Sequence, residues 1–522
     1  MLPATSPRPR TTTVALTALL ALSLAGCVAP KTQTTPTEPP SPTASADTHA
    51  GEGTTGQGID ALYEQQITWE PCEDFECATV VAPLDWEEPE KGTIELAVNR
   101  STATGDVDSR IGSLLINPGG PGGSGTGFLG YAVQTVISAP VLEVYDIVAF
   151  DPRGVGDSSA VSCGDDAQVD AFLTADVPMD DQADVDAARE LTRQFGAACL
   201  ASTGPLLGEV DTVSAAKDLD LLRAVLGDDQ LHFLGFSYGT FLGATYADLF
   251  PDKVGKLVLD GALDPSMSSD DLSLGQAEGF ENALRAYVED CQAGARCPLR
   301  GGVDEGMQQI ADLVGRVEDQ SLPTSDGQEV NGTLAYYGII SSLYEDAVWP
   351  YLTQALTEAL RNNVGDTLFL LASEYLDRNP DGTYRSNLQI AFTAINCLDY
   401  PMPARTYDEM VAFAEQVAAK APTFGKDFAM ATGCESWPFQ STAAREEITA
   451  AGAAPIVVIG TTGDPATPYA WAEALAGQLE SGHLVTWKGE GHTAYGRSND
   501  CVADAVDQYL VEGAVPEDGL TC

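Results

Sequence analysis

The chain has 522 residues, which is enough for one large domain that carries a long insertion or for two domains. Its 77 acidic residues outnumber its 26 lysines and arginines, and the formal net charge is −51. This excess of negative charge argues against nucleic acids and anionic membrane surfaces as partners.

Residues 1–26 are predicted to be a signal peptide of the lipoprotein type. Arg8 and Arg10 precede the apolar run 14–24, which has the length of a signal-peptide core and is too short to span a membrane. The run ends in Leu24-Ala-Gly-Cys27, which resembles the lipobox of bacterial lipoproteins, and this resemblance implies that Cys27 is lipidated. The alternative is an ordinary secretory signal that is cleaved nearby.

Residues 27–58 consist mainly of Thr, Pro, Ser and Gly and contain almost no apolar side chains. Such a segment cannot bury a core, so we predict a disordered tether. A flexible tether after a lipidated cysteine suits an enzyme that is held at the outer face of the bacterial cytoplasmic membrane, or one that is secreted.

The cysteines agree with export, because the eleven cysteines less Cys27 leave an even number. Short loops close most readily, so we expect neighbouring cysteines to pair. The predicted disulfides are Cys72–Cys77, Cys163–Cys199, Cys291–Cys297, Cys397–Cys434 and Cys501–Cys522. No cysteine pair has the spacing of a zinc site and the chain has only four histidines, so we expect neither a metal nor an organic cofactor.

Residues 59–265 are predicted to form the first part of an α/β core. Residues 78–86 and 92–100 alternate between apolar and polar side chains and predict antiparallel strands at one edge of a sheet. Buried strands follow at 112–117, 144–151, 231–234 and 256–262. A capped helix at 211–227 precedes the third of them, and strands that alternate with helices predict a mostly parallel, doubly wound sheet.

Residues 266–450 have a different pattern, with apolar residues at helical spacing and few strand-like runs. We interpret this segment as a mainly helical cap. Strand–helix alternation resumes in residues 451–522, with strands at 454–464 and 483–487. The sequence therefore predicts one α/β core that is interrupted by the cap.

A serine lies at the tip of a predicted sharp turn between a strand and a helix. Gly235-Phe-Ser237-Tyr-Gly239 follows an apolar strand and precedes a helix with small residues on one face. A serine at such a turn needs a strained backbone, and glycines two residues away on either side relieve the crowding. The helix N-terminus favours negative charge that develops beside it. We therefore predict that Ser237 is a nucleophile, the alternative being a chance occurrence of the motif.

A glycine-rich loop, residues 118–125, follows the strand 112–117. No Gly-Lys-Ser/Thr follows, so it is not a P-loop. Backbone N–H groups of such a loop can form an oxyanion hole with the N–H of Tyr238, the residue after the serine. Because prolines lack an N–H, we expect Gly120 to be the second donor, with Gly119 in reserve. A merely flexible loop is the alternative.

The histidines restrict the choice of base. His49 lies in the predicted tether, His232 inside the strand before the serine and His483 at the start of the last strand. Only His492 follows that strand directly, and Asp464 follows the strand before it. Because Ser, Asp and His occur in this order in such hydrolases, we predict a triad of Ser237, Asp464 and His492.

These motifs resemble those of the exported actinobacterial tripeptidyl aminopeptidases, which are α/β-hydrolases of the proline iminopeptidase family. The resemblance covers residues 60–522 and implies the α/β-hydrolase fold, the triad above and the release of short peptides from a free N-terminus. Pro118 stands where the prolyl peptidases of this family have a histidine. The matching stretches are 117–125, 151–158, 235–240, 396–399, 434–438, 463–468, 489–492 and 509–522.

An aminopeptidase must hold the ammonium group of its substrate at a fixed distance from the nucleophile, and a carboxylate is the usual means. Asp399 and Glu435 lie beside two cysteines that we expect to be bridged. We predict that one of them binds the substrate N-terminus.

The predicted protein is a monomeric serine exopeptidase that releases tripeptides or dipeptides from peptide substrates and contacts a membrane only through its lipid anchor. One alternative is an exported esterase or lipase with the same triad. Another is a solute-binding lipoprotein, which would not need the triad.

Overall fold

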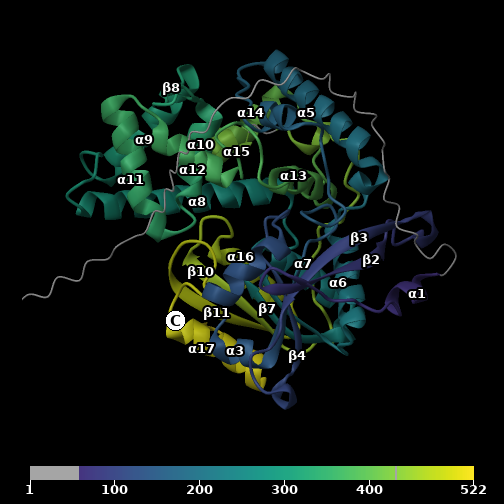
Figure 1. Ribbon diagram of the computed structural model, residues 1–522. Coiled ribbons are helices and arrows are strands. Elements are labelled where there is room, and N and C mark those ends of the chain that lie inside the picture. The colour runs from purple at the N-terminus through teal and green to yellow at the C-terminus, as the bar shows by residue number, and fades with distance from the viewer. Residues whose placement is uncertain (1–57, 430–431) are drawn as a thin grey trace, which may run out of the picture. The chain divides into compact units, whose positions relative to one another are not determined.

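The computed structural model describes residues 58–429 and 432–522 (Figure 1). The predictions for the signal peptide, for Cys27 and for nearly all of the tether lie outside these residues. Among the described helices, none combines the length and the apolar character that a membrane span needs.

A ten-stranded sheet forms the core, in the order β1-β2-β3-β5-β4-β6-β7-β10-β11-β12. The pairs from β1 to β5 along this order are antiparallel, and every later pair is parallel. The mostly parallel sheet and its antiparallel edge are thus confirmed. The strands are β1 (Glu70–Cys72), β2 (Phe75–Pro83), β3 (Thr93–Ser101), β4 (Gly112–Asn117), β5 (Tyr145–Phe150), β6 (Leu231–Phe236), β7 (Val254–Asp260), β10 (Ile456–Gly463), β11 (Gly482–Glu490) and β12 (Leu520–Thr521).

Helices cover both faces of this sheet. Along β4, Leu115 packs in one hydrophobic cluster and its neighbours Leu114 and Ile116 pack in another, because successive side chains of a strand point to opposite faces. The first cluster is completed by α6 (Thr212–Leu226), α7 (Tyr238–Leu249) and α16 (Tyr469–Gln478). The second is completed by α2 (Gly125–Tyr131), α3 (Ala139–Val144) and α17 (Asp500–Glu512). Burial on both faces explains why β4 and β5 are continuous apolar runs.

The chain between β7 and β10, here called the cap, is mainly helical, and most of its helices share a hydrophobic cluster of their own. It leaves the sheet unbroken, because β7 and β10 on either side of it pair directly, with Leu257 opposite Ile456. Its elements are α8 (Ser269–Ala293), α9 (Val303–Asp319), β8 (Leu322–Pro323), β9 (Glu329–Val330), α10 (Gly332–Ser341), α11 (Trp349–Thr357), α12 (Asp366–Tyr375), α13 (Leu388–Asp399), α14 (Tyr407–Ala418) and α15 (Gly425–Ala429).

Two helices from the first half of the chain contact the cap. These are α4 (Asp166–Leu173) and α5 (Gln182–Thr203), which lie between β5 and α6 in the sequence. Asp170 on α4 forms an ion pair with Arg378, and Val185 on α5 packs against Met410 on α14. Figure 1 shows α5 beside α14. The cap is therefore held by contacts with α4 and α5 as well as by its two connections to the sheet.

The structure joins the ten cysteines in the described part of the chain as the predicted neighbours. The bonds are Cys72–Cys77, Cys163–Cys199, Cys291–Cys297, Cys397–Cys434 and Cys501–Cys522. Each closes a short or moderate loop, which removes conformational freedom mainly from the unfolded chain.

Candidate active site

Ser237 lies at the tight turn between β6 and α7, with φ 55° and ψ −122°. Neighbouring glycines make this strained backbone feasible. A Cβ atom on Gly235 would lie 2.4 Å from the main-chain oxygen of Gly239, and one on Gly239 would lie 2.8 Å from the Asn117 side chain. The Ser237 N–H donates to the main-chain oxygen of Asp260 at 2.8 Å, so the turn is fixed by the adjacent strand β7.

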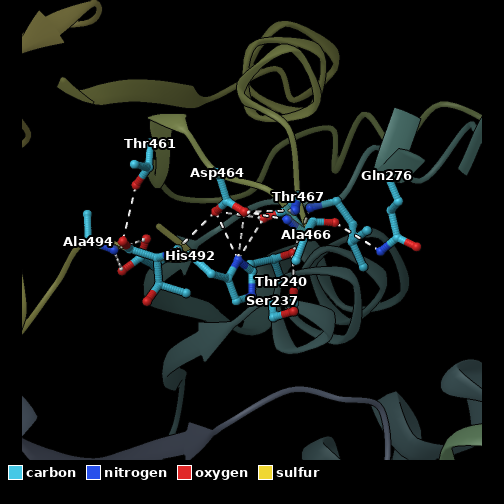
Figure 2. A network of polar contacts seen from close by, with 12 residues as sticks. Ser237, Thr240, Gln276, Thr461, Asp464, Ala466, Thr467, His492 and Ala494 are labelled. Atoms are coloured by element: carbon cyan, nitrogen blue, oxygen red, sulfur yellow. Dashed lines mark hydrogen bonds and ion pairs between the residues drawn. The ribbon is translucent and has the colours of Figure 1, made fainter. Parts of the chain in front are cut away.

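Asp464 and His492 follow β10 and β11, and their side chains are joined. The imidazole Nδ1 lies 2.9 Å from each carboxylate oxygen of Asp464 (Figure 2). The Asp464 side chain is fully buried. It also accepts hydrogen bonds from the N–H groups of Ala466, Thr467 and Thr493 and from the Thr467 hydroxyl. These donors fix the orientation of the carboxylate beside Nδ1 of His492, so the other ring nitrogen, Nε2, is the one left to act on a substrate.

The loop that carries His492 is held on both sides. On the cap side, the His492 N–H donates to the main-chain oxygen of Tyr344 at 2.8 Å, and the two rings meet edge to face. On the core side, the buried Asp260 carboxylate accepts from the N–H groups of Ala494 and Tyr495 at 3.0 and 2.7 Å. Burial raises the pKa of Asp260 to about 6. The sequence did not predict this role, although Asp260 lies in the predicted strand 256–262 and ends the observed strand β7.

The glycine-rich loop lies against the turn of Ser237. The N–H of Gly119 donates to the Asn117 side chain at 2.9 Å, and a Cβ atom on Gly119 would lie 2.5 Å from the main-chain oxygen of Phe236. The N–H of Gly119 is therefore already engaged in a hydrogen bond within the loop, and its Cα packs closely against the main chain of Phe236. Gly120, with φ 111°, lines the same cavity as Ser237. The N–H of Tyr238 is at the first turn of α7, where helix N–H groups have no partner within the helix.

A cavity of about 740 Å³ contains Ser237, His492 and Gly120 in its wall. This volume is within the range of about 300–1,000 Å³ that is typical of small-ligand sites. The other lining residues are mostly apolar or aromatic and include one carboxylate, that of Glu374; they are Pro118, Ser341, Tyr344, Val348, Tyr351, Leu370, Leu371, Tyr375, Leu388, Gln389 and Phe392. Within residues 58–429 and 432–522, no group of His, Cys, Asp or Glu side chains is arranged to hold a metal ion.

Asp399 and Glu435 are not among the residues that line this cavity. The Asp399 carboxylate is buried and accepts from the N–H and the hydroxyl of Thr212 at 2.9 and 2.6 Å, at the N-terminus of α6. Burial raises the pKa of Asp399 to about 7. Glu435 forms an ion pair with Arg189 of α5. Both acids thus have partners within the protein, and neither lines the cavity that contains Ser237.

The geometry suits acyl transfer. A serine in a strained turn and a histidine that is oriented by a buried carboxylate lie in the wall of one cavity (Figure 2). An imidazole held through Nδ1 presents Nε2 as a base, which is the arrangement that activates a serine hydroxyl.

Comparison with known proteins places the chain among hydrolases. Residues 112–336 match the family model described as alpha/beta hydrolase fold, and residues 421–522 match the one described as TAP-like protein. The serine protease Hip1 of Mycobacterium tuberculosis is 38% identical over 483 residues, covering 88% of this chain and 91% of that protein. Carboxylesterase B of the same species is 36% identical over 497 residues, covering 92% and 94%. A tripeptidyl aminopeptidase of Streptomyces coelicolor is 31% identical over 480 residues, covering 87% and 86%. These matches confirm the predicted fold and the resemblance found in the sequence.

Proposed function

Because the chain belongs to the TAP-like serine hydrolases of the α/β-hydrolase family, we propose that it is a serine exopeptidase that releases tripeptides or dipeptides from the free N-terminus of peptides. The observation that carries this proposal is the position of Ser237 and His492 in one cavity of about 740 Å³. A cavity of this size accommodates a short peptide on the acyl side of the scissile bond.

In the proposed mechanism, His492 Nε2 takes the proton of the Ser237 hydroxyl while the serine oxygen attacks the scissile carbonyl carbon. The oxyanion is stabilised by the N–H groups of Gly120 and Tyr238, because Gly119 already donates to Asn117. The imidazolium, held by Asp464, then protonates the leaving amine, and the carbon–nitrogen bond breaks. Water, activated by the same histidine, hydrolyses the acyl-enzyme.

We propose Glu374 as the group that binds the substrate ammonium, in place of Asp399 or Glu435. It is the carboxylate in the cavity wall. Its neighbour Arg385 also pairs with Asp377, so two negative charges face one positive charge. The net charge of this cluster is −1, which favours an incoming ammonium group.

The test is the hydrolysis of tripeptidyl p-nitroanilides with free and with acetylated N-termini. We expect hydrolysis of the free peptides, loss of hydrolysis on acetylation, and no turnover by Ser237→Ala. Glu374→Gln should raise KM for free peptides, whereas Glu90→Gln, at an exposed acid outside the cavity, should not. Equal hydrolysis of free and acetylated peptides would contradict the exopeptidase, and an unchanged KM in Glu374→Gln would contradict the role of Glu374 alone.

The proposed location is outside the cytoplasm, with the chain either anchored through a lipid on Cys27 or secreted. Five disulfides in the structure support an oxidising compartment. Incorporation of labelled fatty acid that is lost in Cys27→Ala would support the anchor, and its absence in the unaltered chain would favour secretion. We propose a monomer with peptide substrates as its partners, and gel filtration tests the monomer.

An esterase is the second candidate, because the cavity wall is largely apolar and a relative that is 36% identical is named a carboxylesterase. Turnover of p-nitrophenyl esters that depends on Ser237, without turnover of peptides, would favour it. A solute-binding lipoprotein does not fit a member of this hydrolase family.

A further inference from the structure

A second cavity adjoins the catalytic one. It has a volume of about 1,500 Å³ and is lined by parts of β1, β2 and β3, by α2 and by residues between α12 and α13. Pro118 and Leu388 line both cavities. The larger cavity therefore begins where the wall of the smaller one ends.

An ion-pair cluster joins the two sides of this wall. Glu374 lines the catalytic cavity, whereas Arg385 and Asp377 line the second cavity. The Arg385 guanidinium donates to both carboxylate oxygens of Glu374 at 3.2 and 3.0 Å and, through Nε, to Asp377 at 2.9 Å. A guanidinium with three such bonds has little freedom to rotate, since its planar fork matches the carboxylate geometry.

The backbone around Arg385 is also fixed. Its N–H donates to the main-chain oxygen of Asp377 at 2.9 Å, and Arg378 and Tyr384 pair as an antiparallel bridge between these two residues. Both Arg378 and the Tyr384 hydroxyl bond Asp170 of α4, at 2.6 and 2.9 Å. Exposed ion pairs alone contribute little, but here the loop that carries the arginine is held independently by α4.

We propose that Arg385 closes the catalytic cavity on the side of the second cavity and thereby sets the length of the released peptide. This inference rests on the proposed exopeptidase function. The substrate ammonium stops at Glu374, and any residue further toward the N-terminus has to pass the position that the guanidinium occupies. Without the guanidinium, the acyl segment extends into the second cavity, so longer peptides bind productively.

Peptidyl p-nitroanilides test the proposal directly, because colour appears only when the whole peptide ahead of the anilide is the acyl group. A nested series from dipeptide to hexapeptide is given to the full chain and to its Arg385→Ala, Arg385→Lys and Arg193→Ala variants. Arg193 is the matched control, an exposed arginine in an ion pair on α5. Labelling of Ser237 by a fluorophosphonate and the unfolding temperature establish that each variant is folded.

In the unaltered chain, we expect colour without a lag from the di- or tripeptide only. A longer substrate should first release a short peptide, and any colour should follow only from a second cut of the shortened anilide, so initial rates of colour are compared. In Arg385→Ala, the ratio of colour from penta- and hexapeptides to colour from the short substrate should rise by about tenfold, the change that ~1.4 kcal/mol produces. Arg385→Lys should change the ratio less, and Arg193→Ala should leave it unchanged.

An unchanged length profile in folded, labelled Arg385→Ala overturns the proposal and leaves the exopeptidase intact. Direct colour from long substrates in the unaltered chain overturns both. Should Arg385→Ala fail to fold, Asp170→Asn serves instead, because it loosens the same loop from α4 and should raise the ratio in the same direction; no change in that variant overturns the proposal.

Discussion

Replacement of Asp464 by asparagine tests the catalytic arrangement most sharply. The N–H groups of Ala466 and Thr467 point at one carboxylate oxygen and cannot accept a hydrogen bond, so the amide oxygen must remain there. The new NH₂ group therefore faces the Thr467 hydroxyl and His492 Nδ1 on the other side, where it also displaces the longer bond from the Thr493 N–H. His492 then accepts through Nδ1 and carries its proton on Nε2, where it cannot take the proton of Ser237.

The magnitude follows from the charge that is lost. Two unit charges 2.9 Å apart attract by ~6 kcal/mol at an effective dielectric constant of about 20. Removing this stabilisation of the imidazolium lowers kcat by ~10⁴-fold, with KM for the tripeptidyl anilide nearly unchanged. The control is Asp304→Asn, at an acid whose side chain is 86% exposed. A loss smaller than about tenfold in a folded protein would refute Asp464 as the acid that orients the base.

Three further predictions address the surroundings of the triad. Gly120→Ala places a Cβ atom 3.0 Å from the backbone nitrogens of Gly122 and Gly123 at φ 111°, so the loop should shift and kcat should fall by about 10²-fold or more. Gly477→Ala, in the open part of α16, should have no effect, and equal activities of the two variants would contradict the need for this loop conformation at Gly120. Thr467→Val removes the hydroxyl that donates to Asp464 at 3.0 Å, so kcat should fall about tenfold. Thr467→Ser keeps a hydroxyl and should retain activity. Identical losses of kcat in the two variants would exclude the hydroxyl as the cause. Burial raises the pKa of Asp399 from 3.8 to about 7, so the native state binds this proton more tightly than the unfolded chain does. The contribution of this one group to stability is therefore complete below about pH 4 and is lost as the pH rises to about 7, by ~4 kcal/mol. Asp399→Asn should flatten this part of the pH profile in urea unfolding, and an unchanged slope would contradict the assignment.

Local patterns in the sequence were sufficient to locate the residues of the candidate triad. Ser237 is marked by a buried strand, two glycines at fixed spacing and a helix, all within one short stretch. His492 and Asp464 could be identified as the base and the acid because the chain has only four histidines and because each of the two residues comes shortly after a predicted strand. Such signals depend only on neighbours along the chain, so they can be read without a structure.

Residues whose roles depend on distant partners were not found in this way. Asp399 and Glu435 stand beside bridged cysteines in the sequence. Nothing in that context indicates that Asp399 accepts a hydrogen bond from Thr212 or that Glu435 forms an ion pair with Arg189. Glu374 lies in a helix with ordinary periodicity, and its place in the cavity wall depends on how the cap packs. The contact of α4 with the cap is likewise a tertiary feature, because Asp170 and Arg378 are far apart in the chain.

The order of the strands along the chain has a consequence for the newly made protein. The nucleophile is on β6, whereas the acid and the base follow β10 and β11, after the whole cap has been synthesised. Since β10 must pair with β7 across that interval, the sheet cannot be completed until the last part of the chain is available. A chain that emerges from its N-terminus therefore carries its serine without a base for most of its synthesis. The serine, the base and the acid can come together only when the final strands join the sheet.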